Sequence, residues 1–582
     1  MKRMSRQSTR PAISCRAALL PMLIAGLLGT EAASAQTMQQ RLHAVSAHMA
    51  QLQSFAAKLS SSQKGKLSSG AQHLLHAADH WDEMAAPITR SAATLNSPLP
   101  GRAFIPSGPL PFGEVSDPGT DLVSRVAGFT QSETSTAWCG SNVLVAYNDS
   151  GSFLETFPLP RGLSFNGYSL STDGGRSFTD QGFLNAPGFF DFLGGDPVTV
   201  CTDSNTFYQS SIFQTVNQTP AVTTFLTGVS VSKSTDGGRT FADPVAVILK
   251  DLALHFIDKP WMAVDPSHPN RLYVTYTDFD ATGLILPPIP SAICPGNLRL
   301  GIELVASTDG GITWSSPRVI DAGCYPNLDQ GSNVAVDGTG NVFVAWEQFP
   351  AAIPTNELDI VKSSDGGATF SPKVAVAIVT PVGHSFFGLL QGGFSNNEFP
   401  SLAIDRSSRP SNGTLYIAWN DGRLGVTPDS YPPGFVGITY NFGDAFVTRS
   451  SNGGATWAAA VKVNDNTGAT GSPADHYLPG IAVDSTGRVG VCFYDRRHDT
   501  GNFLIDRECA SSRDGGQTWV NQRVTESSFS ASIAADLLIN PVYMGDYDGV
   551  TADSTARSEG FFGAYGSNAR GNPDVVSARF GD

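Results

Sequence analysis

Two kinds of hydrophobic pattern divide the chain. Between residues 42 and 81 apolar residues recur at steps of three and four, which predicts helices. From residue 119 onward, short apolar or alternating stretches are separated by Gly-rich polar turns, which predicts strands. The pattern therefore indicates a short helical segment followed by a large all-β domain.

The helical pattern has two parts, separated by the stretch SSSQKGK, which breaks the periodicity. The two apolar seams consist of Leu42, Val45, Met49, Leu52, Ala56 and Leu59, then Leu67, Ala71, Leu74, Ala78 and Trp81. We expect an αα-hairpin over residues 36–90, followed by a Pro/Gly-rich linker over residues 91–118. The hairpin either docks on the main domain or mediates self-association, and both interpretations stay open.

A strand-pair pattern recurs through the β domain, residues 119–582. Each copy has an apolar strand, a polar turn and a second strand ending in aromatic and acidic residues, as in DKPWMAVDPSHPNRLYVTYTDFD at 258–280. We recognise seven copies, the last of which ends with the strand DVVSARF at 574–580. A strand preceding the first copy, DLVSRVAGF at 121–129, would complete the last sheet and close the array. We expect seven sheets, with six as the alternative.

A second motif follows the strand pairs and occurs six times: STDGGRSF (171–178), STDGGRTF (234–241), STDGGITW (307–314), SSDGGATF (363–370), SSNGGATW (450–457) and SRDGGQTW (512–519). The Asp or Asn can accept hydrogen bonds from backbone N–H groups of its own turn. The paired glycines adopt conformations that a Cβ disfavours, and the final aromatic residue packs beneath the turn. We therefore interpret the motif as a structural staple rather than a catalytic or metal-binding site.

Charge and cysteine content restrict the compartment and the partners. Residues 1–16 are basic, residues 17–29 are apolar but too short to span a bilayer, and the small residues Ala33-Ser34-Ala35 follow. This pattern predicts a signal peptide cleaved after Ala35, hence a secreted or periplasmic protein without a transmembrane segment. The full chain has a formal charge of −15, which makes nucleic acid an unsuitable partner.

Six cysteines remain beyond the signal peptide, and an even number in an exported chain permits three disulfides. The best supported pair is Cys492–Cys509, because both residues fall on adjacent strands of one predicted hairpin. Proximity in sequence suggests Cys294–Cys324 and Cys139–Cys201. Buried free thiols stay open for these two pairs.

The six copies of the turn motif resemble the Asp boxes, or bacterial neuraminidase repeats, of the sialidase superfamily. The resemblance covers residues 119–582 and implies a β-propeller whose boxes lie away from the active-site face. Sialidases have six blades, whereas the strand-pair count favours seven. The boxes also occur in propellers that are not sialidases, so the resemblance is specific for architecture and not for reaction.

Aligning the modules on the turn that ends each first strand defines one position at the start of each innermost strand. This position holds Glu133, Asp196, Asp258, Gln330, Glu398, Tyr477 and Asp546. Innermost strands converge on a propeller axis, so five carboxylates would form a ring there. Such a ring needs compensation by a cation, either a Ca²⁺ ion held by residues such as Glu133 and Asp546 or arginine side chains.

The ends of the second strands carry four arginines: Arg423, Arg496, Arg497 and Arg570. Guanidinium groups bind carboxylates bidentately, so these residues could hold an acidic sugar. The alternative is that they pair with local aspartates such as Asp421 and Asp495.

The sialidase resemblance implies catalytic roles for some of these positions. Sialidases use a tyrosine nucleophile, a glutamate that activates it, an aspartate acid/base and three arginines. Tyr477 and Glu398 match the tyrosine and glutamate patterns, while Asp196 and Asp258 are assigned to the acid/base role by ring position alone. No arginine–isoleucine–proline motif precedes the first box, and the separate arginine-bearing module expected before Tyr477 is not seen.

Three functions are compatible with these features. The first is a glycoside hydrolase that acts on acidic, sialic-acid-like glycans through Tyr477, Glu398 and the arginines. The second is a non-catalytic propeller that binds a glycan, a protein or Ca²⁺. The third is a lyase that cleaves uronic-acid polymers, for which His or Tyr together with Arg would supply the base and the carboxylate partner.

Overall fold

The computed structural model describes residues 40, 42–64, 75, 78–82, 110, 113–117, 128–156, 161–220, 222–285, 293–350, 355–384, 389–429, 439–465, 473–530, 536, 539, 544–555, 559–571 and 573–581. The expected signal peptide and most of the expected linker lie outside these residues. The chain divides into two compact units, residues 1–47 and residues 48–582, and every strand of the described residues lies in the second unit.

The described strands of the second unit form seven mainly antiparallel sheets, which follow the order of the chain except that β3 lies between β2 and β4 and belongs to the second sheet. The first contains β1 (Gln131–Cys139), β2 (Asn142–Asp149), β4 (Asn166–Ser171) and β5 (Thr179–Phe183). The second contains β3 (Leu163–Ser164), β6 (Phe192–Leu193), β7 (Val198–Cys201), β8 (Phe207–Gln218), β9 (Thr223–Ser234) and β10 (Val245–Asp251). The third contains β11 (His255–Val264), β12 (Leu272–Asp280), β13 (Arg299–Ser307) and β14 (Arg318–Cys324). The fourth contains β15 (Leu328–Val336), β16 (Val342–Phe349), β17 (Asn356–Ser363) and β18 (Val374–Val379).

The remaining three sheets come from the C-terminal part of the chain. The fifth contains β19 (Gly383–His384), β20 (Leu389–Leu390), β21 (Phe394–Ser395), β22 (Ser401–Ile404), β23 (Leu415–Pro428), β24 (Thr439–Ser450) and β25 (Val461–Lys462). The sixth contains β26 (His476–Val483), β27 (Val489–Asp495), β28 (Leu504–Ser512), β29 (Val520–Arg523) and β30 (Phe529–Ser530). The seventh contains β31 (Val550–Thr551), β32 (Phe561–Ser567) and β33 (Asp574–Phe580).

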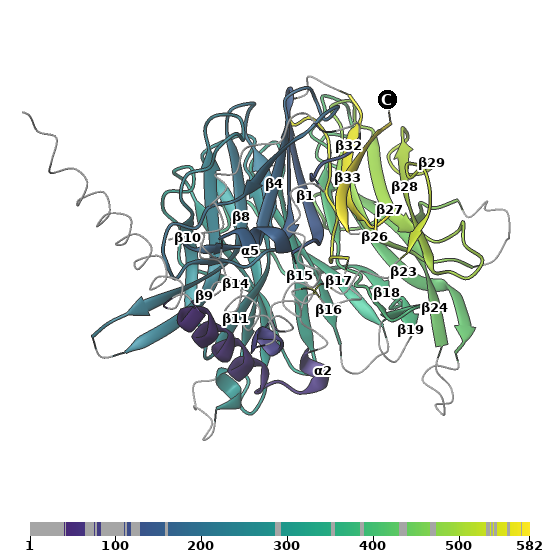
Figure 1. Cartoon of the computed structure of the whole chain (residues 1–582). Helices are drawn as coiled ribbons and strands as arrows, with labels where there is room; N and C mark the ends of the chain where they lie inside the picture. Colours follow the sequence, from purple (N-terminus) through teal and green to yellow (C-terminus); the bar gives the residue numbers. More distant parts are fainter. Residues whose placement is uncertain are drawn as a thin grey trace, which may run out of the picture. The chain divides into compact units, whose positions relative to one another are not determined.

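The sheets are arranged as a closed propeller. The innermost strands β1, β7, β11, β15, β22, β26 and β31 contact one another in this order, and β31 returns to β1. In Figure 1 the yellow strands β32 and β33 accordingly lie beside the dark blue β1. Six sheets have at least four strands and count as blades. The expectation of seven blades is therefore wrong, because the last module forms a sheet of only three strands.

The closing contact differs in detail from the expected one. Glu114 forms an antiparallel bridge with Val576, and the amide of Ser577 donates to the carbonyl of Gly113 at 2.9 Å. The strand expected to close the ring, residues 121–129, lies mostly outside the described residues. A segment preceding the first blade thus pairs with β33, but it lies several residues earlier than predicted.

The six repeated turns have the structure that their sequence predicts. In the first, Asp173 Oδ1 accepts hydrogen bonds from the amides of Arg176 and Ser177, both at 3.0 Å, and Oδ2 accepts one from the Ser177 hydroxyl at 2.7 Å. Both glycines of every copy have φ between 68° and 88°, the left-handed region that favours glycine. These turns join the third strand of each blade to the outer part, so they are structural staples.

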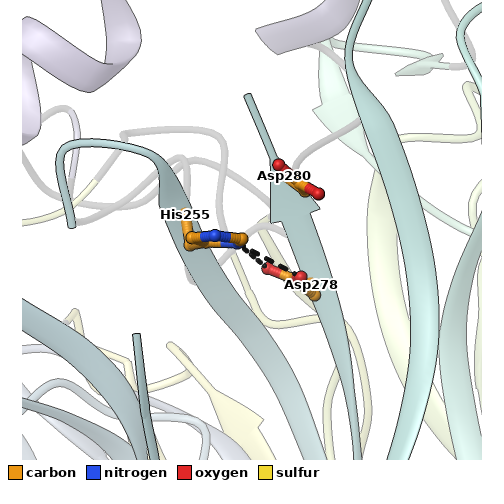
Figure 2. A group of neighbouring side chains, drawn as sticks. All are labelled: His255, Asp278 and Asp280. Atoms are coloured by element: carbon orange, nitrogen blue, oxygen red, sulfur yellow. Dashed lines mark hydrogen bonds and ion pairs between the residues drawn. The ribbon is translucent and has the colours of Figure 1, made fainter. Parts of the chain in front are cut away.

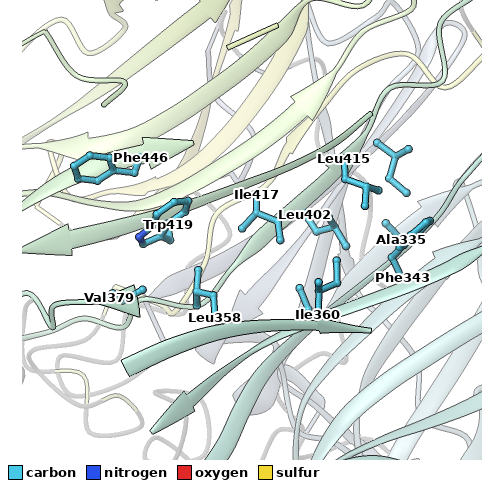
Figure 3. Close-up of a cluster of buried hydrophobic side chains, with 12 residues drawn as sticks. Ala335, Phe343, Leu358, Ile360, Val379, Leu402, Leu415, Ile417, Trp419 and Phe446 are labelled. Carbon is cyan, nitrogen blue, oxygen red and sulfur yellow. The ribbon is translucent and has the colours of Figure 1, made fainter. Parts of the chain in front are cut away.

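The hydrophobic core lies between neighbouring blades. Figure 3 shows one cluster, in which Leu358 and Ile360 of the fourth sheet face Ile417 and Trp419 of the fifth. Trp419 is fully buried, and its ring stacks on Phe446 with centroids 6.0 Å apart. Burial of each large apolar side chain contributes about 1.5–3 kcal/mol, so contacts of this kind hold the blades at fixed angles around the axis.

Helical segments precede the propeller and pack on it. Residues 42–56 are helical, and the short helix α2 (Ser61–Lys64) follows. Two further short helices, α5 (Ser150–Thr156) and η1 (Thr282–Leu284), lie within the propeller sequence. The Phe55 ring lies 5.9 Å from that of Phe256, and Trp81 lies 6.5 Å from Phe153. Trp81 belongs to the apolar seam that self-association would need, so its contact with Phe153 favours docking. No helix among the described residues has the length and hydropathy needed to cross a membrane.

Three disulfides are present: Cys139–Cys201, Cys294–Cys324 and Cys492–Cys509. All three expected pairs are therefore confirmed. The first links the innermost strands of the first two blades, and the third joins adjacent strands within the sixth.

Candidate functional site

The innermost strands share a strained feature near the axis. Glu133, Asp196, Lys259 and Leu478 have φ of 51°, 51°, 54° and 50°, values that residues with a Cβ seldom adopt. In β1, β11 and β26 these residues open a β-bulge, where the pairing register with the next strand shifts. Such a conformation costs on the order of 1–3 kcal/mol, so its repetition marks a place where the backbone is bent for a purpose.

The bulges correct the predicted ring of carboxylates. They align Glu133 and Asp196 with Lys259 and Leu478, not with Asp258 and Tyr477, so five carboxylates do not share one register. The reason is length: the first two blades have one more residue between the bulge and the following turn than the third and sixth have. An alignment anchored on that turn is therefore displaced by one residue.

The sequence does contain a signal for the correct register. In four modules a proline marks this register: Pro197, Pro260, Pro400 and Pro479. Aligning the modules on these prolines places the residues that directly precede them, Asp196, Lys259, Phe399 and Leu478, at the same position. Selecting acidic residues alone missed Lys259.

Two carboxyl groups, those of Glu133 and Asp196, are fully buried together near the axis. Glu133 accepts hydrogen bonds from Asn148 Nδ2 at 2.8 Å and from the amide of Asp546 at 3.0 Å. Burial, followed by the negative charges of Glu133 and Asp258, raises the pKa of Asp196 well above its ordinary value, although Lys259 opposes this. Asp196 therefore favours its protonated form, whereas the side chain of Glu133 accepts hydrogen bonds from Asn148 and Asp546.

Lys259 supplies positive charge at the axis. Its Nζ lies 3.9 Å from Asp546 Oδ2, 3.7 Å from the centroid of the Tyr547 ring and 5.3 Å from that of Phe399. A second buried cation, Arg507, donates from Nη1 to Asp548 Oδ2 at 3.1 Å. The compensation expected from Ca²⁺ or from the arginines at the strand ends is thus partly provided by side chains that the sequence did not single out.

The described residues contain one cluster with the spacing of metal ligands, and it lies elsewhere, in the third blade. Figure 2 shows His255, Asp278 and Asp280 facing one another from β11 and β12. His255 Nδ1 lies 2.9 Å from Asp278 Oδ1, and Lys250 Nζ lies 2.8 Å from Asp278 Oδ2. Arg299 Nη1 is also within 3.9 Å of Asp280. Three basic groups already occupy these carboxylates, so we assign the cluster as an ion-pair network. Glu133 and Asp546 are not part of it.

A pocket of about 40 Å³ lies at the axis, where the inner strands of several blades meet. Its lining combines aromatic rings with amides and charged groups: Trp261, Phe399 and Tyr547; Asn333, Asn397 and Asn420; Lys259, Asp546 and Asp548. Asn397 Nδ2 donates to Asp546 Oδ1 at 3.0 Å, which fixes that carboxylate. Apolar walls with a few placed polar groups are typical of small-ligand sites.

Tyr477 is fully buried in the sixth blade. Its ring stacks on Tyr494 with centroids 5.4 Å apart, and the guanidinium carbon of Arg496 lies 5.5 Å from its centroid. Its hydroxyl makes no well-aligned hydrogen bond with the described residues. Burial raises the pKa of Tyr477 above its ordinary value, although the positive charge of Arg496 opposes the shift. In this conformation Tyr477 is a neutral phenol.

Glu398 is held in a separate network that comes close to Tyr477. Its Oε1 accepts hydrogen bonds from the amide of Val382 at 3.0 Å and from Asn396 Nδ2 at 2.9 Å. Asn420 Nδ2 lies 3.5 Å from the same oxygen, and Asn420 Oδ1 accepts from the amide of Leu478 at 3.1 Å. Asn420 therefore connects Glu398 to the residue that follows Tyr477.

Of the two carboxylates assigned by ring position to the acid/base role, Asp258 accepts a hydrogen bond from Gln330 Nε2 at 3.4 Å, and Asp196 belongs to the buried pair described above.

The four arginines bind different acceptors, with no carboxylate common to two of them among the described residues. Arg423 pairs with Asp421, Arg496 with Asp475, Arg497 with Asp495 and Asp465, and Arg570 with Glu114. Arg496 is fully buried and also donates to the carbonyls of Gln391 and Asn502 at 3.0 and 2.9 Å. A clamp on one anion would require these local pairs to exchange.

No family model matches the chain, and no curated protein matches it. Among solved structures it is similar to Trypanosoma rangeli sialidase, with 13% identity and a TM-score of 0.36 over 66% of this chain and 54% of that one. It is also similar to Penicillium chrysogenum α-L-arabinanase, with 13% identity and a TM-score of 0.41 over 67% and 94% of the two chains. It is also similar to the NanB sialidase of Streptococcus pneumoniae, with 10% identity and a TM-score of 0.37 over 75% of this chain and 82% of that one. The chain thus spans about half the length of the Trypanosoma enzyme. At these values the comparisons carry no argument about activity.

Proposed function

We propose that this protein is an exported, glycan-acting β-propeller with sialidase-like glycoside hydrolase activity, and that its substrate enters at the axial pocket. The single observation that carries the proposal is the lining of that pocket. Trp261, Phe399 and Tyr547 offer apolar ring surfaces, and three asparagines with Lys259 and Asp546 offer hydrogen-bonding groups. Sugars have apolar C–H faces and rims of hydroxyl groups, so this combination suits them.

The chemistry that we assign follows from the two networks beside the pocket. Asp196, which favours its protonated form, is suited to donate a proton to a leaving group, as a general acid does. Tyr477 is the proposed nucleophile, and Glu398 is the base that would take its proton. The buried, neutral state of Tyr477 means that substrate binding has to bring the hydroxyl and this carboxylate together.

Acidic glycans are the first substrates to test, because Arg496 and Arg497 directly follow β27 and the guanidinium carbon of Arg496 lies 5.5 Å from the centroid of the Tyr477 ring. We also propose export to the periplasm or the exterior from the predicted signal peptide, which agrees with three disulfides. Self-association through the N-terminal helices stays a proposal, although Trp81 of that seam packs on the propeller and so favours docking.

A second candidate is a non-catalytic glycan-binding propeller. Two observations favour it: Tyr477 is fully buried, and a pocket of about 40 Å³ has room for about three water molecules rather than a whole sugar ring. In this case the same pocket would bind the edge of a sugar without cleaving it.

A glycan screen separates the two candidates. We would measure release of reducing sugar from acidic and neutral oligosaccharides by the wild type, by Tyr477→Phe and by Tyr494→Phe, a matched control whose hydroxyl bonds to the carbonyl of Gly566. A hydrolase with this nucleophile loses at least a hundredfold in kcat in Tyr477→Phe only. Cleavage that survives in Tyr477→Phe removes the proposed nucleophile. Binding without cleavage by the wild type establishes the second candidate.

A further inference from the structure

Three buried polar atoms in the axial pocket have no hydrogen-bond partner among the described residues. They are Nζ of Lys259, a side chain 3% exposed, Oδ1 of Asn333, a residue 4% exposed, and Oγ of Ser332, a residue 1% exposed. All three residues line the pocket. Leaving a buried polar group unsatisfied costs about 1–3 kcal/mol, so each atom marks a place where a bound molecule or water completes the structure.

Two of these atoms, Lys259 Nζ and Asn333 Oδ1, have opposite requirements. The ammonium of Lys259 can only donate hydrogen bonds, and the carbonyl oxygen of Asn333 can only accept them. A carboxylate ligand would satisfy Lys259 and leave Asn333 without a donor, whereas an ammonium ligand would be repelled by Lys259. A hydroxyl group both donates and accepts, so hydroxyl groups satisfy both atoms.

The charges around the pocket also favour an uncharged ligand. Asp546 Oδ2 lies 3.9 Å from Lys259 Nζ, which is too long for a direct hydrogen bond. A ligand oxygen placed about 2.8 Å from each atom would bridge them, accepting from Lys259 and donating to Asp546. Glu133 lies nearby behind Tyr547, whose hydroxyl donates to the carbonyl of Pro197, and the negative charge of Glu133 disfavours an anion.

The shape of the pocket fits the edge of a sugar. The rings of Trp261 and Tyr547 pack edge to face with their centroids 5.4 Å apart, and Phe399 forms a further wall of the pocket. The Phe399 ring packs directly on Gly331, where a Cβ would lie 2.2 Å from ring carbon Cδ1. Only glycine permits this approach, so the backbone is specialised to keep an aromatic wall at this position.

We propose that the axial pocket is a subsite for the hydroxyl groups of an uncharged sugar unit, bound by Lys259, Asn333 and Asp546. The inference rests on the proposed function, since it takes a glycan as the ligand, and it narrows that function. The sugar unit at the axis carries no carboxylate, and any acidic unit of the same glycan binds outside the pocket.

Titration calorimetry with single sugars tests this subsite. Galactose, mannose, glucuronate and glucosamine are titrated into the wild type, Lys259→Met, Asn333→Ala and Lys362→Met. Lys362 is a matched control, because its Nζ lies 5.6 Å from the Phe343 ring in the fourth blade and outside the pocket lining. We expect a neutral sugar to bind the wild type best, with at least tenfold weaker binding in the first two variants and none of this loss in Lys362→Met. Circular dichroism verifies folding, and Asn333→Ala alone decides if Lys259→Met does not fold.

Three results of the calorimetry would overturn the subsite: preference for glucuronate, preference for glucosamine, or sugar affinities that neither pocket variant changes. The hydrolysis screen is run on the same proteins and reports separately on the proposed function. Cleavage by Lys259→Met and Asn333→Ala at wild-type kcat and KM overturns the subsite and leaves the hydrolase. Lys259-dependent binding of neutral sugars without cleavage by the wild type leaves the subsite and rejects the hydrolase.

Discussion

The ammonium group of Lys259 lies 3.7 Å from the centroid of the Tyr547 ring. Lys259 belongs to the inner strand of the third blade, and Tyr547 immediately precedes the last sheet, so the contact spans the axis rather than joining neighbouring blades. A desolvated cation over an aromatic face is stabilised by about 2 kcal/mol. The pair therefore ties distant modules together and keeps a positive charge among the axial carboxylates.

Substitutions of Tyr547 separate the ring from the hydroxyl. Tyr547→Phe removes the hydrogen bond to the carbonyl of Pro197, which we expect to lower the free energy of unfolding by about 1 kcal/mol. Tyr547→Leu also removes the face beneath Lys259, so its loss should be about 3–4 kcal/mol. Urea unfolding followed by tryptophan fluorescence measures both values. Equal losses in the two variants would show that the Lys259 contact does not stabilise the protein.

The buried Asp196 predicts a pH-dependent stability. Because its pKa is raised in the folded protein, mainly by burial and then by Glu133, the folded state binds the proton more tightly than the unfolded chain does. Stability from this group is complete below the ordinary pKa of 3.8 and declines as the pH rises toward the folded pKa. Asn is a neutral mimic of protonated Asp and can still donate to Glu133, so Asp196→Asn should escape this decline.

We therefore expect Asp196→Asn to unfold at nearly the same temperature as the wild type at pH 4 and at a higher temperature at pH 8. Differential scanning calorimetry from pH 4 to pH 8 measures the difference. A difference that does not change with pH, or that is negative at pH 8, would contradict the assignment of Asp196 as the protonated partner.

Features that depend on residues close together in sequence were predictable. The turn motif determines its own hydrogen bonds within five residues, so its structure at Asp173 follows from six similar segments. Cys492–Cys509 followed from a hairpin pattern in the same way. The axial site was less predictable, because one added residue in the first two blades displaces the alignment of Asp196 with Lys259 by one position.

Contacts between distant modules were the least predictable features. The pairing of Glu114 with Val576 joins residues at opposite ends of the propeller domain, and no local pattern distinguishes this segment from residues 121–129. The same limit applies to Lys259, whose partners Asp546 and Tyr547 lie almost three hundred residues away in sequence. Only the closed ring of inner strands brings them together.

The natural variation among the repeated turns predicts which substitutions they tolerate. In the fifth turn Asn452 replaces Asp, its Oδ1 accepts from the amide of Thr456 at 3.0 Å, and its Nδ2 donates to the Thr456 hydroxyl at 2.7 Å. Asp173→Asn should therefore change the free energy of unfolding by less than about 0.5 kcal/mol at pH 7. Asp173→Ala loses these acceptors and should cost about 1–2 kcal/mol, as removal of a helix-capping side chain does.

The same turn gives a pH dependence of opposite sign to that of Asp196. Burial of Asp173 is outweighed by hydrogen bonds from Ser177 and Ser171, which lower its pKa to about 2. Its contribution is complete above the ordinary value near 3.8 and is lost as the pH falls toward 2. Thermal unfolding of the wild type and of Asp173→Asn between pH 5 and pH 2 checks this: the wild type should lose more stability, and parallel curves would contradict the role of the carboxylate.

The disulfides allow a prediction about which inter-strand links stabilise the ring most. Cys139–Cys201 joins residues 62 positions apart, whereas Cys492–Cys509 joins residues 17 positions apart. In the chain-entropy model these links restrict the unfolded chain by about 4 and about 3 kcal/mol, respectively. We therefore expect the double substitution of Cys139 and Cys201 by Ala to lower the unfolding temperature more than that of Cys492 and Cys509 by Ala, as measured by calorimetry at equal protein concentration. Cys139 and Cys492 are both buried, so Ala leaves a similar gap at each of these two positions and serves as a matched replacement there.

Thiol labelling of the unfolded wild type should detect no free thiol among the six cysteines until a reductant is added. A larger effect of the shorter link would mean that packing around Cys492–Cys509 in the folded protein, and not restriction of the unfolded chain, decides which link contributes more.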